Sequence, residues 1–306
     1  MDARTAQPRL AHPETSRRDQ DRSRRLPLLV VARQIRRWPL PVIATLAVAA
    51  LAVLPGRSDA AVRAPAQPRP TIVLIHGAWA DASSWAGVVR RLQRDGYTVD
   101  APPNQLRGLT GDAAYVSAFL ATIAGPIVLV GHSYGGAVIT NAATGNANVK
   151  ALVYVDAFIP DQGETALNLA NAQPGSCLGG DPTKVYNLVQ YPGAPKGDYD
   201  LYIKPAVFPS CFANGVAGQE AALLASTQRP VTLSALMTPS GVPAWKAIPS
   251  WSLFGTADRV IPPAEQRLMS ERAHAHITEI DAGHPSLVSH PGAVTTVIEQ
   301  AVHATA

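Results

Sequence analysis

Short apolar runs and amphipathic segments alternate along the chain from residue 71 to its end. Six runs rich in β-branched residues and leucine have the length of buried strands, and they span residues 71–75, 97–101, 127–130, 151–155, 250–254 and 277–280. Five segments suited to helices lie between or after them, at residues 83–94, 112–124, 137–143, 263–272 and 293–302. Strands that alternate with helices form a parallel sheet with helices on both faces. We therefore predict an α/β fold with about six parallel strands.

The alternation is interrupted between residues 160 and 249. Prolines and glycines are frequent there, the apolar residues follow neither a strand nor a helix period, and the two cysteines, Cys177 and Cys211, both fall within it. The interruption comes after the strand at 151–155, where the chain leaves the carboxyl edge of the sheet. We predict that residues 160–249 form a cap over that edge.

The N-terminal part of the chain differs from the rest in charge. Twelve of the 26 Lys and Arg residues precede residue 65, against five Asp and Glu residues, so the remainder is net acidic although the whole chain carries a net charge of +4. A nucleic-acid partner therefore has little electrostatic support. Two arginines at 36–37, an apolar run at 38–54 and small residues at Ser58 and Ala60 are typical of an export signal cleaved after Ala60.

These features predict three parts: a signal peptide or signal anchor with a basic leader at 1–60, a linker at 61–70 and a folded domain at 71–306. The apolar run of 17 residues is at the lower limit for a membrane span. We expect a secreted or cell-envelope protein that contacts the membrane only if the N-terminal segment is not cleaved.

The most informative motif lies directly after the strand at 127–130. Gly131, Ser133 and Gly135 form Gly-x-Ser-x-Gly between a buried strand and a helix, which is the context of a nucleophile elbow. Such a turn needs glycines because backbone approaches backbone there, and it holds the serine hydroxyl out at the carboxyl edge of the sheet. A plain strand-to-helix turn is the alternative interpretation.

Several further segments extend this picture to a family. The chain contains H-G-A-W at 76–79, D-A-S-S-W at 81–85 and G-H-S-Y-G-G-A-V-I-T at 131–140, with Q-R-P, P-A-W-K and I-P-S-W between 228 and 251. From Thr71 to the end it resembles the α/β-hydrolase superfamily, in particular the small bacterial serine esterases grouped with plant methyl-ester esterases and hydroxynitrile lyases.

The resemblance implies a catalytic triad in the chain order Ser133, Asp258, His284. A serine hydroxyl is a poor nucleophile at neutral pH, so a histidine must accept its proton and a carboxylate must orient that histidine. Asp258 and His284 each follow a predicted strand by a short loop, as the family requires. Asp156 also ends a strand and is the alternative acid, whereas His132 is expected to pack within the elbow.

The same resemblance assigns the oxyanion hole and leaves the reaction partly open. The amide of Tyr134 and that of Ala78, with Trp79 as a substitute, are the expected oxyanion donors. The plant lyases carry lysine after the catalytic histidine where this chain has Pro285, which disfavours lyase chemistry.

These assignments favour a serine carboxylesterase acting through an acyl-enzyme on esters of short to medium acyl chain or on compact aromatic esters. The alternatives on the same triad are a cofactor-free perhydrolase and a C–C bond hydrolase or lyase. A non-catalytic ligand receptor of the same fold is a further alternative. The sequence names neither the natural ester nor the oligomeric state.

The cysteine pair and the lack of ligand motifs complete the expectations. An even number of cysteines in an exported protein indicates a disulfide, here Cys177 with Cys211. No metal-ligand spacing and no Gly-rich phosphate loop after a strand occurs in the sequence. We expect no cofactor and no metal, and a small-molecule ester as the partner.

Overall fold

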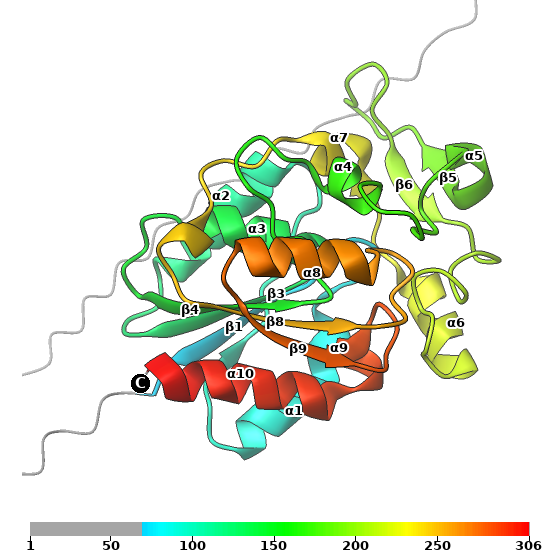
Figure 1. Cartoon of the computed structure of the whole chain (residues 1–306). Helices are drawn as coiled ribbons and strands as arrows, with labels where there is room; N and C mark the ends of the chain where they lie inside the picture. The colour runs from blue at the N-terminus through cyan, green and yellow to red at the C-terminus, as the bar shows by residue number, and fades with distance from the viewer. Residues whose placement is uncertain (1–68, 306) are drawn as a thin grey trace, which may run out of the picture. The chain divides into compact units, whose positions relative to one another are not determined.

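The computed structural model describes residues 69–305, and its main element is a six-stranded parallel sheet (Figure 1). The strand order is β2-β1-β3-β4-β8-β9. The strands are β1 (Thr71–Ile75), β2 (Val99–Asp100), β3 (Ile127–His132), β4 (Val149–Val155), β8 (Ser250–Gly255) and β9 (His276–Ile280). The predicted α/β fold with six parallel strands is confirmed.

Alternate residues of the central strands enter two separate apolar clusters. Val73 and Ile75 of β1 belong to one cluster, and Ile72 and Leu74 to the other. Because successive side chains of a strand point to opposite faces, a strand buried on both sides must be apolar throughout. This is why the sheet strands read as continuous apolar runs and not as alternating ones.

Helices cover both faces of the sheet. On one face, α1 (Ala86–Arg94) packs against α10 (Pro291–Thr305), and on the other, α2 (Leu109–Leu120) packs against α3 (Tyr134–Ala142) (Figure 1). The helix α8 (Pro263–Arg272) lies on the same side as α2 and α3. The 3-10 helix η1 (Ala82–Trp85) precedes α1, and the short helix α9 (Ser286–Ser289) precedes α10.

Some predicted boundaries were wrong, for local reasons. The predicted helix at 112–124 begins at Leu109, because the Asp112 carboxylate lies inside its first turn and accepts hydrogen bonds from the amides of Arg107 and Gly108. The predicted strand at 97–101 shrinks to two residues of β2, since the amide of Tyr97 donates to the end of α1 at Leu92. The side chain of Asp81 caps the N-terminus of η1.

The segment between β4 and β8 contains regular structure that its sequence pattern does not predict. Strands β5 (Tyr186–Val189), β6 (Asp200–Ile203) and β7 (Val231–Thr232) form an antiparallel sheet in the order β5-β6-β7. The helices α4 (Ala166–Ala170), α5 (Pro182–Val185), α6 (Gly218–Thr227) and α7 (Leu233–Met237) and the 3-10 helix η2 (Ala244–Lys246) accompany it. We keep the name cap for residues 160–249 of this segment. The strands of the cap have four residues or fewer, which is too short for a detectable period.

The expected disulfide is present in the cap and joins Cys177 to Cys211, whose Cα atoms are 5.6 Å apart. The amide of Cys177 donates to the carbonyl of Arg259, so the bridged segment is also held by the loop after β8.

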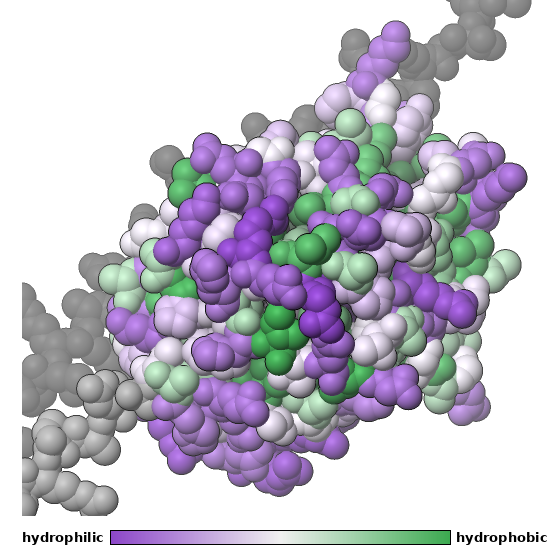
Figure 2. Space-filling model, viewed as in Figure 1, coloured by the Kyte–Doolittle hydropathy of each residue, from purple (hydrophilic) through white to green (hydrophobic). Residues whose placement is uncertain are grey.

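The surface on the face seen in Figure 2 is largely hydrophilic, with hydrophobic residues in small groups between the polar ones. Within residues 69–305 no helix combines the length and the apolarity that a membrane crossing requires. The predicted export segment at 1–60 and nearly all of the linker at 61–70 lie outside the described residues and stay predictions.

Candidate active site

The turn between β3 and α3 places Ser133 in an unusual backbone conformation. Its φ is 53°, a left-handed value that non-glycine residues rarely adopt. The glycines around it are required by contact: a Cβ on Gly131 would lie 2.5 Å from the carbonyl oxygen of Gly135, and one on Gly135 would lie 2.4 Å from that of Ile75. These glycines permit the sharp turn that brings Ser133 to the carboxyl edge of the sheet.

Ser133, His284 and Asp258 form one continuous hydrogen-bonded chain. The Nε2 atom of His284 is 3.0 Å from Ser133 Oγ, and its Nδ1 atom is 2.8 Å from Asp258 Oδ2. With Nδ1–H donating to the carboxylate, Nε2 is free to accept the serine proton. All three side chains are buried, so few water molecules compete for these bonds. The structure thus brings Ser133 together with an acid and a histidine that lie more than a hundred positions after it in the sequence.

The Asp258 carboxylate is held by neighbours other than His284. Its Oδ1 atom accepts the amides of Val260 at 2.7 Å and Ile261 at 3.0 Å, and its Oδ2 atom accepts Gln266 Nε2 at 2.7 Å. These donors compensate a buried negative charge and fix the plane of the carboxylate. Gln266, on α8, was not among the predicted site residues.

Asp156, the alternative acid, contacts the backbone around the site and makes no hydrogen bond to the ring of His284. Its carboxylate accepts the amide of Gly255 at 2.8 Å, and both the amide, at 3.1 Å, and the hydroxyl of Ser286. Burial, and then the nearby negative charge of Asp258, raises the pKa of Asp156 well above the ordinary aspartate value. Asp156 therefore ties the ends of β4 and β8 to the segment that follows His284.

The predicted oxyanion residues Ala78 and Tyr134 line one narrow cleft together with Ser133. Among the residues that the structure describes, neither backbone amide has a hydrogen-bond acceptor. Both amides are therefore free to donate to a ligand oxygen. Gly77 is needed beside them, since a Cβ there would lie 2.6 Å from the Cβ of Ser133.

His76 fixes the loop that carries Ala78. Its Nε2 atom accepts the amide of Asn104 at 2.9 Å, so the ring is the neutral tautomer whose Nδ1–H donates to the carbonyl of Gly77, also at 2.9 Å. Asn104 Nδ2 donates in turn to the carbonyl of His76. Burial lowers the pKa of His76 to about 4. Asn104 was missed, because it lies 28 residues away in a loop without a motif.

Trp79 attaches the same loop to the cap. Its Nε1–H donates to the carbonyl of Leu201 in β6 at 2.9 Å, and its ring stacks on Tyr186 of β5 with 5.9 Å between centroids. The ring of a further cap residue, Phe212, packs against the ring of His284 with 5.2 Å between centroids. These contacts place cap residues against both the oxyanion loop and the histidine, and no sequence motif indicates them.

The other histidines near the site have structural positions. His132 Nε2–H donates to the carbonyl of His284 at 3.3 Å, and burial lowers the pKa of His132 well below the ordinary histidine value. It packs within the elbow, as expected. His290 is exposed and bonds to its neighbour Ser289. Within residues 69–305 no three His, Cys, Asp or Glu side chains are grouped as a metal site.

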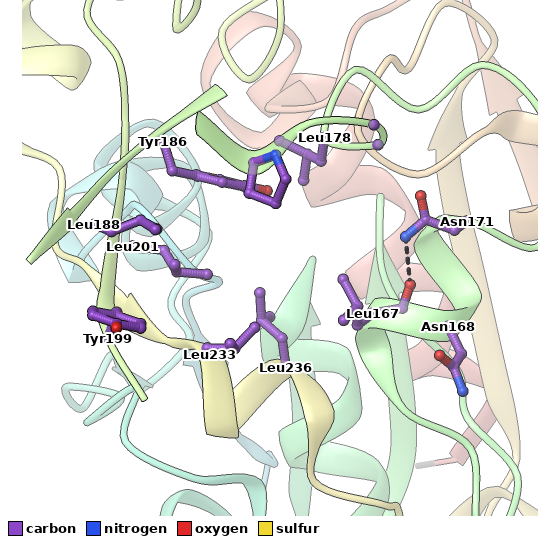
Figure 3. Close-up of a pocket in the computed structure, with 13 residues that line it drawn as sticks. Leu167, Asn168, Asn171, Leu178, Tyr186, Leu188, Tyr199, Leu201, Leu233 and Leu236 are labelled. Atoms are coloured by element: carbon purple, nitrogen blue, oxygen red, sulfur yellow. Dashed lines mark hydrogen bonds between the residues drawn. The ribbon is translucent and has the colours of Figure 1, made fainter. Parts of the chain in front are cut away.

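A larger cavity adjoins the Ser133 cleft inside the cap (Figure 3). Its volume is about 660 Å³, and we call it the cap chamber. The chamber and the cleft share five lining residues, which are Leu167, Asn171, Leu178, Tyr186 and Leu236. The chamber therefore borders the cleft that contains the nucleophile.

A parallel sheet with a serine elbow, and an acid and a histidine on later strand ends, is the architecture of α/β-hydrolases. Residues 72–297 match the model of the alpha/beta hydrolase family, and the chain belongs to that family. The resemblance inferred from the H-G-A-W and G-H-S-Y-G-G segments is confirmed.

Two relatives show the range of similarity in sequence. The carbendazim hydrolyzing esterase of Nocardioides sp. (strain SG-4G) is 33% identical over 110 residues, which are 32% of this chain and 46% of that esterase. The chain thus matches about half the length of that relative. The alpha/beta hydrolase nvfD of Aspergillus novofumigatus (strain IBT 16806) is 26% identical over 254 residues, covering 76% of this chain and 96% of the fungal protein.

Solved structures share the fold at lower identity. A pyrethroid hydrolase from Sphingobium faniae JZ-2 superposes with a TM-score of 0.61 at 23% identity, over 77% of this chain and 98% of its own. Polyneuridine aldehyde esterase gives 0.65 at 20% identity, over 76% and 99%. Tomato methylketone synthase I gives 0.66 at 18% identity, over 78% and 100%.

The depressed pKa of His76 predicts a specific loss of stability in acid. Unfolded His76 protonates near its ordinary pKa of 6.5, whereas folded His76 stays neutral down to about pH 4. Its contribution is therefore full above pH 6.5 and is lost as the pH falls toward 4, amounting to about 3 kcal/mol. Urea unfolding of wild type and His76→Gln between pH 7 and pH 4 measures this difference.

Glutamine does not titrate, so the His76→Gln variant is the reference that shows how all other groups change the free energy of unfolding in acid. The stability difference between the two proteins should shrink as the pH falls through this window. Curves that stay parallel from pH 7 to pH 4 would contradict the assigned neutral tautomer.

Proposed function

We propose that this protein is a serine carboxylesterase that cleaves carboxylic esters through an acyl-enzyme. The observation that carries the proposal is the buried chain from Ser133 Oγ through His284 to Asp258, with 3.0 Å and 2.8 Å between the bonded atoms. Esterases among the relatives support the reaction class. An intact triad also disfavours a purely ligand-binding role, which needs no activated nucleophile.

Each step of the reaction has a residue to perform it. Ser133 Oγ attacks the ester carbonyl while its proton passes to His284 Nε2, and the amides of Ala78 and Tyr134 donate to the developing oxyanion. The intermediate collapses, and the alcohol leaves with the proton from His284. His284 then takes a proton from water, which attacks the acyl-serine, and returns it to Ser133 Oγ as the carboxylic acid leaves. Asp258 orients the ring and stabilises its charged form throughout.

The cleft beside Ser133 supports a compact acyl group. Its walls are apolar, including Trp79, Phe158, Ala166, Ala170 and Val260. Ala166 and Ala170 on α4 are small, whereas Trp79 and Phe158 are bulky. We therefore propose esters of short to medium acyl chain, or compact aromatic esters, as substrates.

The role of Ser133 as the nucleophile can be tested by mutation. Because the elbow and not side-chain packing holds this residue, Ser133→Ala should fold normally and lose several orders of magnitude in kcat, as triad deletions do. Phenylmethylsulfonyl fluoride should label wild type on Ser133, as detected by peptide mass spectrometry. More than a few per cent of wild-type turnover in the alanine variant would refute the assignment.

Replacing each of the two buried aspartates with asparagine should show which one is the catalytic acid of the triad. In Asp258→Asn an amide donor faces the donors Gln266 Nε2 and His284 Nδ1–H, so the wrong histidine tautomer is favoured and kcat should fall by roughly 10⁴-fold, the scale of this change in other triads. Asp156→Asn leaves one backbone amide without an acceptor, but Asp156 is not bonded to the ring of His284, so the histidine tautomer is unchanged. Its kcat should therefore fall far less. The reverse ranking in steady-state assays would make Asp156 the acid.

Acyl-chain length tests the size of the cleft. Each buried methylene should add roughly 0.8 kcal/mol until the cleft is full. A series of p-nitrophenyl esters from acetate to palmitate should therefore show kcat/KM peaking at or below about eight carbons, a length inferred from typical pocket volumes. A steady rise to palmitate with a jump at the micelle threshold would indicate an interfacial lipase instead.

A further inference from the structure

The cap chamber has walls without charge. Its lining comes from α4, the segment at 178–182, β5, β6 and α7, and none of these lining residues is Asp, Glu, Lys, Arg or His. Figure 3 shows leucine and tyrosine side chains arranged around one common space, with Leu178 and Tyr186 on one side and Leu233 and Leu236 on another. Asn171 is turned aside, since its amide donates to the carbonyl of Leu167 at 2.8 Å. The chamber therefore suits an uncharged, apolar group.

The chamber and the Ser133 cleft share part of their walls. Leu178 and Tyr186 line both the chamber and the Ser133 cleft, and Tyr186 also stacks on Trp79 of the oxyanion loop. Cys177, adjacent to Leu178, is bonded to Cys211, adjacent to Phe212. The shared walls are therefore anchored both to the oxyanion loop and to the segment that packs on His284.

The sizes of the two spaces differ in a way that assigns the two halves of an ester. The chamber volume of about 660 Å³ lies in the range of sites for drug-sized ligands, whereas the cleft at Ser133 is narrow. We propose that the chamber binds the alcohol group of the ester, a bulky, uncharged and apolar one, while the compact acyl group lies in the cleft. This assignment rests on the proposed esterase function and on its compact acyl group.

Two neighbouring residues of β5 provide a matched test. Leu188 lines the chamber and pairs across the sheet with Leu201, which also lines it. Val189 pairs with Asp200, whose carboxylate is bonded to Arg107, and does not line the chamber. Both side chains are similarly exposed, at 42% and 44%. Adjacent strand residues point to opposite faces, so the same substitution can be compared inside and outside the chamber.

The experiment compares three esters by pH-stat titration with the full chain. Ethyl acetate is compact on both sides, biphenyl-4-ylmethyl acetate has the bulky alcohol, and ethyl biphenyl-4-ylacetate has the bulky acyl group. Leu188→Trp should narrow the chamber and suits a strand, and Leu188→Asn should make its wall polar. Each should lower kcat/KM for the bulky-alcohol ester at least fivefold and leave ethyl acetate within twofold. Val189→Trp and Val189→Asn are the controls and should leave both unchanged.

The outcomes separate the two proposals. The chamber assignment alone would be overturned if wild type hydrolyses ethyl acetate and the Leu188 variants keep the wild-type kcat/KM for the bulky-alcohol ester. If the Leu188 variants instead lose kcat/KM for the bulky-acyl ester, the chamber binds the acyl group, and the assignment to the alcohol group is overturned as well. Wild type that hydrolyses none of the three esters and does not react with phenylmethylsulfonyl fluoride would overturn the esterase function itself.

Discussion

The close approach of backbone at the turn after β3 is the constraint on which the site depends. Side chains on Gly131 or Gly135 would overlap the carbonyl oxygens of Gly135 and Ile75, and one on Gly77 would overlap Ser133. Only glycine allows β1, the elbow and the oxyanion loop to meet at these distances. The strained φ of Ser133 is therefore maintained by the packing of buried strands around it, and α3 can begin at Tyr134 with a free amide.

A parallel sheet converts this local geometry into a site. All six strands run in one direction, so the loops after β3, β8 and β9 emerge at the same edge. Ser133, Asp258 and His284 stand on these three loops, which explains how residues far apart in sequence meet. The buried side chains of the triad, of Asp156 and of Gln266 are bonded to one another or to backbone, and this offsets the cost of removing them from water.

The sequence predicts what depends on periodicity and on motifs, and it fails where contacts are long-range. The strands and the elbow were predictable because apolar runs and Gly-x-Ser-x-Gly are local signals. Gln266, Asn104 and the bond from Trp79 to Leu201 were not, because in each contact one partner, Gln266, Asn104 or Leu201, lies in a segment without a motif. The antiparallel sheet of the cap was missed for a different reason: its strands are too short for a period to be counted.

Asp156 and Asp258 show the limit most clearly, because both are buried aspartates that follow a buried strand. Their environments give them different chemistry. Three protein donors and the imidazole surround the carboxylate of Asp258, which is thereby held against Nδ1 of His284. Among the described residues the Asp156 carboxylate bonds only to Gly255 and Ser286, and burial raises its pKa. The difference arises from where β8 and the loop after β9 pass each residue, so it belongs to the assembled fold and not to either segment alone.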